Sequence, residues 1–157
     1  TVANVPPATV YAIKVERTDG DDFELRRSGA GGREFQVFAP SVLGPGTQQH
    51  QMKYLSGIFD NLRLFDAKRL PDRPNIDVQQ RVSVTAANGL IITLNHVSTD
   101  KNDRIWAVLQ ANPVPGVPLA KTTIEELARI RSAVDGWMLL LPRPVSERLK
   151  IRLQDLL

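Results

Sequence analysis

The sequence contains no cysteine and only two histidines among its 157 residues. The missing cysteine excludes disulfides, cysteine-ligated zinc and thiol nucleophiles, and the scarce histidine leaves little material for imidazole catalysis. No apolar run without glycine is longer than the five residues of 137–141, whereas about 20 are needed to cross a bilayer. Apolar residues make up 42% and charged residues 24%, which excludes a disordered or coiled-coil chain and indicates a globular protein.

The chain also has only a small excess of positive over negative side chains. The net charge is +3, and residues 1–80 contribute nothing to it because they hold ten basic and ten acidic side chains. The excess comes from residues 129–157, with six basic and three acidic side chains. Trp137 is the single aromatic residue of that segment, which therefore lacks the stacking aromatics typical of nucleic-acid binders. We expect no nucleic-acid partner.

Motifs that carry catalysis or bind metal are missing as well. The glycine-rich segment 29–32 precedes an expected strand rather than the helix of a phosphate loop. His50 and His96 have no second ligand at metal spacing. One acidic cluster lacks the spacing of a calcium loop; it consists of Asp19, Asp21, Asp22 and Glu24. We expect no enzyme, cofactor or metal, and keep a hydrolase using His50 or His96 as a third hypothesis.

Alternating apolar residues and turn signals divide the first half of the chain into short elements. Asp19-Gly20 predicts a hairpin turn between two strands. The expected elements are strands over 10–15, 23–25 and 35–37, a helix over about 47–62 and a strand over 64–70. The helix is predicted from an apolar stripe formed by Met52, Leu55, Phe59 and Leu62.

The second half shows the same order of signals. Asn88-Gly89 predicts the hairpin turn, and Pro142 ends the last strand. The expected strands cover 82–84, 90–94, 105–109 and 137–141. A capping box, Thr122 with Glu125 or Thr123 with Glu126, predicts the start of a helix that ends at Gly136. Its expected buried stripe is Ile124, Leu127, Ile130 and Val134.

The matching order predicts an internal duplication within one domain, 1–157. Val15, Gly20 and Leu25 correspond to Val84, Gly89 and Leu94 at a constant offset of 69 residues. The expected fold is α+β, with two βββαβ repeats (about 8–71 and 80–142) that form an antiparallel sheet with helices packed on it. Two subdomains with separate sheets, joined at 71–76, are the alternative.

A C-terminal helix over about 144–157 follows the repeats. Its apolar stripe is Val145, Leu149, Leu153 and Leu156. Its other faces carry Arg148, Lys150 and Arg152, and Arg143 precedes the helix. These cations form either a surface for an anionic partner or the solvated side of a packed helix. Trp106 and Trp137 either pack in the core or stack on a ligand.

Five segments together resemble a known bacterial family, the domain-of-unknown-function 4340 family. They are 10–20, 23–27, 88–94, 135–137 and 141–142. The likeness extends over about 10–157. Members typically follow an N-terminal membrane anchor and are often encoded beside auxiliary ABC transport components, and the family has no assigned activity. The resemblance implies an extracytoplasmic, periplasmic-side domain whose anchor lies outside this sequence.

Two functions follow as hypotheses. The first is a non-catalytic interaction module, an accessory part of a membrane transport or cell-envelope complex, which binds a protein partner at a sheet edge or between the repeats. The alternative is a small-ligand binding domain with a pocket between the repeats, lined by Trp106 or Trp137.

Overall fold

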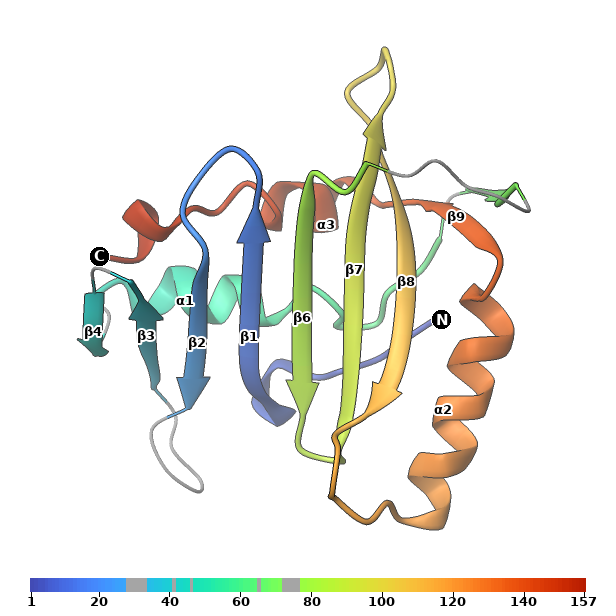
Figure 1. Cartoon of the computed structure of the whole chain (residues 1–157), viewed down its shortest axis with the longest axis horizontal. Helices are drawn as coiled ribbons and strands as arrows, with labels where there is room; N and C mark the ends of the chain where they lie inside the picture. The colour runs from blue at the N-terminus through green and yellow to red at the C-terminus, as the bar shows by residue number, and fades with distance from the viewer. Residues whose placement is uncertain (28–33, 41, 46, 65, 72–76) are drawn as a thin grey trace.

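One antiparallel β-sheet organises the chain, with strand order β4-β3-β2-β1-β6-β7-β8-β9-β5 (Figure 1). The structure is a computed structural model that describes residues 1–27, 34–40, 42–45, 47–64, 66–71 and 77–157. The strands are β1 (Val10–Arg17), β2 (Phe23–Arg27), β3 (Phe35–Ala39), β4 (Val42–Pro45), β5 (Asp66–Arg69), β6 (Gln80–Ala86), β7 (Leu90–Thr99), β8 (Ile105–Pro113) and β9 (Trp137–Leu140). The helices are α1 (Gln49–Ser56), α2 (Lys121–Val134) and α3 (Arg143–Arg148), with short 3-10 helices η1 (Pro7–Thr9) and η2 (Leu153–Leu156). The expected α+β class with an antiparallel sheet is confirmed.

The two predicted hairpin turns differ in the structure. Gly89 has φ +90°, a conformation that other residues rarely adopt, so the Asn88-Gly89 turn between β6 and β7 is confirmed. The connection between β1 and β2 is longer, over residues 18–22. There Asp22 accepts a hydrogen bond of 2.8 Å from the backbone N–H of Arg17. This side chain closes the loop in place of a tight turn at Gly20.

The two-repeat arrangement is not confirmed. Each half contributes a three-stranded meander, and the halves join where β1 pairs with β6, with Lys14 opposite Ser83. The first half has an additional strand, β4, and its closing strand β5 lies at the opposite edge of the sheet, where Asp66 faces Leu140 of β9. Because both halves form one sheet, the alternative of two subdomains with separate sheets is wrong.

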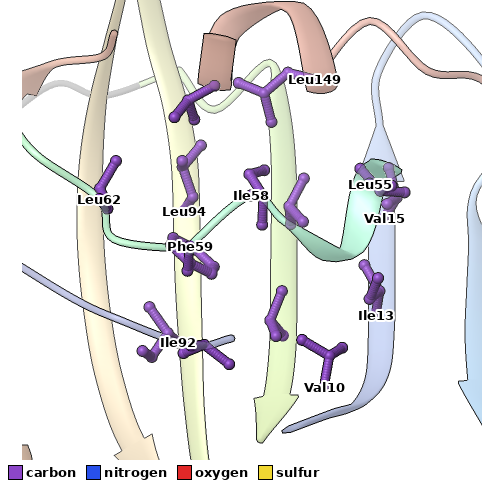
Figure 2. Close-up of a cluster of buried hydrophobic side chains, with 14 of the residues drawn as sticks. Val10, Ile13, Val15, Leu55, Ile58, Phe59, Leu62, Ile92, Leu94 and Leu149 are labelled. Atoms are coloured by element: carbon purple, nitrogen blue, oxygen red, sulfur yellow. The ribbon is translucent and has the colours of Figure 1, made fainter. Parts of the chain in front are cut away.

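The main core lies between one face of the sheet and the helices behind it. In Figure 1, α1 and α3 cross behind the strands, and α2 lies beside β8. Alternate strand residues point to this face, as strand geometry requires. Figure 2 shows Val10, Ile13, Val15, Ile92 and Leu94 of the sheet facing Leu55, Ile58, Phe59, Leu62 and Leu149. The predicted stripe of α1 is buried, although the helix ends at Ser56. Phe59 follows in a turn, and Leu62 forms an isolated bridge with Ala3.

The predicted capping box is not formed at the start of α2. The helix begins at Lys121 and its N-cap residue, Ala120, makes no side-chain hydrogen bond. Thr122 and Thr123 therefore lie inside the first turn. Ile124 is 54% exposed, whereas the other three members of the predicted stripe are buried. Gly136, at φ +82°, follows the end of the helix as predicted.

The expected continuous helix over about 144–157 is wrong. The α-helix ends at Arg148, and η2 begins at Leu153. In a continuous helix the carbonyl of Leu149 would accept from the N–H of Leu153. Here it accepts from Nη1 of Arg17 and Nε2 of Gln80, each at 3.0 Å. Because these donors occupy the carbonyl, the chain leaves the helical path.

We predict that Phe59→Ala lowers the free energy of unfolding by about 3–5 kcal/mol, because Phe59 is fully buried and its removal leaves a cavity. Urea denaturation followed by circular dichroism measures the loss. Tyr11→Ala is the control; its side chain is 54% exposed, and we expect a change within about 0.5 kcal/mol. Equal losses in the two variants would contradict the assigned core.

Candidate functional site

The four C-terminal cations do not form one surface. Arg148 donates to the carbonyl of Tyr54 and stacks on its ring at 4.3 Å. Arg152 pairs with Asp19, with 3.0 Å between Nη2 and Oδ2. These two side chains therefore fasten the C-terminal segment to α1 and to the β1–β2 loop. Arg143 and Lys150 lie elsewhere, in the walls of a pocket.

Both tryptophans are covered by cations of the edge strand β5. Lys68 places its Nζ 4.2 Å from the ring centre of Trp106, and Arg69 places its guanidinium 5.1 Å from that of Trp137. Trp106 is buried outside the main core cluster, and Trp137 packs against that cluster half-buried. Neither contributes to the pocket that holds Arg143 and Lys150.

The two histidines lie apart. His50 is an exposed residue of α1. His96 has its Nε2 2.9 Å from Oγ1 of Thr99, and burial lowers the pKa of the imidazole below its ordinary value. This ring is therefore neutral near pH 7.

The acidic cluster forms internal contacts instead of a shared ligand set. Asp19 accepts from Arg17, which lowers the pKa of that carboxyl, and Glu24 pairs with Arg26 at 2.9 Å. Within the described ranges, no three or more metal-ligating side chains come together. The glycine-rich segment 29–32 lies outside the described residues.

The strongest candidate site is a pocket of about 560 Å³ beside α3, called here the α3 pocket. One wall comes from α3 and the residues after it, another from the β7–β8 turn, and the rest from β5 and the end of β9. The lining residues are Asp66, Asn102, Asp103, Arg104, Leu140, Leu141, Arg143, Ser146, Glu147 and Lys150. Such a volume suits a small organic ligand.

The β7–β8 turn is held in place by one carboxylate. Asp100 accepts from the backbone N–H groups of Asn102 and Arg104, at 2.9 and 3.0 Å, and from Nε of Arg104 at 2.9 Å. The bond from the Arg104 N–H, with the other two donors, lowers the pKa of the Asp100 carboxyl. These bonds hold Asn102, Asp103 and Arg104 at the rim of the pocket.

The two charged walls differ in sign. On the α3 side, the Glu147 carboxylate forms ion pairs with two cations. It lies 3.1 Å from Lys150 and 4.0 Å from Arg143. On the other side, Arg104 is paired with Asp100, and neither Asp66 nor Asp103 pairs with a cation of the described ranges. The α3 pocket therefore has a positive wall and a negative wall, and it can orient a dipolar ligand.

Sequence reasoning singled out Arg143 and Lys150 but missed the other charged members of the α3 pocket. Asp66 and Asp103 lie far apart in the chain and come together only through the β8–β9–β5 pairing. The β7–β8 turn covers residues 100–104, because β7 continues to Thr99 and β8 begins at Ile105. Nothing in its composition indicated that it borders a pocket.

Asp100 predicts an acid dependence of stability. Its carboxyl has a folded-state pKa below the ordinary value of an aspartate, so its contribution to stability is complete above that ordinary value and is lost as pH falls through the folded-state pKa. We predict that the difference in unfolding free energy between the native chain and Asp100→Asn shrinks from about pH 5 to about pH 2. Urea titrations at each pH measure it. Asp21→Asn, at an exposed carboxylate, is the control; a constant Asp100→Asn difference would contradict the prediction.

Comparison with known proteins supplies no relative for this site. No family model, curated protein or solved structure matches the chain.

Proposed function

We propose that this chain is a non-catalytic protein-interaction module, the extracytoplasmic accessory part of a membrane transport or cell-envelope complex. The supporting observation is the outer edge of β5, the terminal strand next to β9. All four of its residues are exposed. An edge strand of this kind can accept a strand from a partner protein.

The hydrogen bonds of β5 indicate which groups face outward. Leu70, just after the strand, donates its N–H to the carbonyl of Gly136 on the β9 side, at 2.9 Å. Because backbone groups alternate along a strand, the N–H groups of Ala67 and Arg69 point away from β9. Asp66 caps the N–H of Ala67 at 2.8 Å. No acceptor among the described residues binds the N–H of Arg69, which can therefore donate to a partner.

The placement outside the cytoplasm rests on the family resemblance. Over the described residues, no helix has the length and apolar character required to span a membrane. In this proposal the attachment to the complex is made by protein contact at β5.

We predict that a photo-reactive phenylalanine derivative at Ala67 cross-links to a transport or envelope protein in membranes of the source cell. Arg69→Pro should abolish the adduct, because proline has no N–H to donate. Arg69→Gln should keep the adduct. Both variants lose the contact with the Trp137 ring, but only Arg69→Pro loses the backbone N–H. Mass spectrometry of the adduct identifies the partner.

A second photo-reactive site at Lys121, exposed at the start of α2, is the positional control. Circular dichroism confirms that Arg69→Pro remains folded. The proposal fails if the adduct from position 67 is absent, if it also forms from position 121, or if it survives in Arg69→Pro.

Small-ligand binding is the second candidate function, and the volume of the α3 pocket favours it. Its site differs from the one expected from the sequence, because the α3 pocket lies between α3 and the β7–β8 turn. At the junction of the two halves β1 and β6 are directly paired.

A further inference from the structure

The charged side chains that line the α3 pocket indicate which kind of ligand it can bind, which its volume alone does not. Three lining side chains are cations and three are carboxylates: Arg104, Arg143 and Lys150 against Asp66, Asp103 and Glu147. The lining is therefore neutral in formal charge. A ligand with only an anionic group would face Asp66 and Asp103, two carboxylates that pair with no cation among the described residues.

Because cations and carboxylates lie on different walls, the α3 pocket can orient a ligand that carries both charges. The Arg143 side chain is 89% exposed. Its guanidinium lies 4.0 Å from the Glu147 carboxylate, which Lys150 binds more closely, so it can bind a second anionic group. Asp103, on the opposite rim, is held at φ +60° by the turn that Asp100 fixes. Its carboxylate pairs with no cation in the part of the chain that the structure describes, and it can therefore bind a cationic group of a ligand.

Between the charged walls lies an apolar floor. Leu140 and Leu141 line the α3 pocket, and their side chains are almost fully buried there. A ligand that places an apolar group against these leucines buries its own hydrocarbon surface away from water.

From this arrangement we infer that the α3 pocket binds a small zwitterion that carries a free ammonium group, a free carboxylate and an apolar side chain. The carboxylate contacts Arg143 and Lys150, and the ammonium contacts Asp66 and Asp103. Amino acids and short peptides share this chemistry. The inference deepens the second candidate function, small-ligand binding, and is independent of the β5 edge.

The test uses isothermal titration of the whole chain with leucyl-leucine, N-acetyl-leucyl-leucine, leucyl-leucinamide and free leucine. We expect leucyl-leucine or leucine to bind, and each blocked dipeptide to bind at least about tenfold more weakly than leucyl-leucine, because a charge-assisted contact is lost. The tighter of leucine and leucyl-leucine identifies the source as an amino acid or a peptide. Equal binding of the acetylated and free dipeptides, or no binding of leucine and leucyl-leucine at 1 mM, roughly the weakest useful affinity, overturns the inference.

Two variants locate the contacts. Asp103→Asn should weaken leucyl-leucine but leave the acetylated dipeptide unchanged, and asparagine tolerates the left-handed backbone at this position. Arg143→Gln should weaken leucyl-leucine and the acetylated dipeptide alike. Lys121→Gln, at an exposed cation of α2, is the matched control and should change neither. Weakening by the control to the same extent would overturn the assignment of the site.

The outcome is separable from that of the β5 proposal. Arg69→Pro lies outside the lining of the α3 pocket and should keep its affinity for the zwitterion. Loss of zwitterion binding with an intact cross-link from position 67 would refute this inference alone, and the reverse result would refute the β5 proposal alone.

Discussion

The pairing of β1 with β6 joins the three-stranded meander of the first half of the chain to that of the second. It also brings the side chains of Arg17 and Gln80 together, since these residues face each other at one end of the pairing. Both donate to the carbonyl of Leu149. A contact within the sheet therefore decides where the C-terminal helix ends, and α3 in turn forms one wall of the α3 pocket.

Local signals were read correctly where the structure depends on neighbours in sequence. Asn88-Gly89 forms the predicted turn, Gly136 follows the end of α2, and the stripe of α1 is buried. These features require only that a residue suit its own backbone conformation or one face of a helix. The capping box failed because threonines at the start of α2 lie inside the helix, where a capping side chain has no role.

Features that depend on distant parts of the chain were not predictable. The C-terminal segment has the regular apolar stripe of a continuous helix. The helix nevertheless ends early, where the Leu149 carbonyl accepts from donors more than 60 residues away in sequence. The crossing of β5 to the far edge has no local signal. Since the α3 pocket combines Asp66, Asp103 and Arg143 through that crossing, composition showed its cations but not its carboxylates.

The position of β5 also sets the order in which the molecule can be completed. Its partner β9 is synthesised about 70 residues later in the chain (Asp66 to Leu140), so β5 has no sheet to join while the ribosome makes the intervening strands. Contacts of such long sequence separation slow folding. The nascent chain must therefore carry a charged, unpaired strand until β9 has been made, and the lysine and arginine of β5 reduce its tendency to aggregate during that interval.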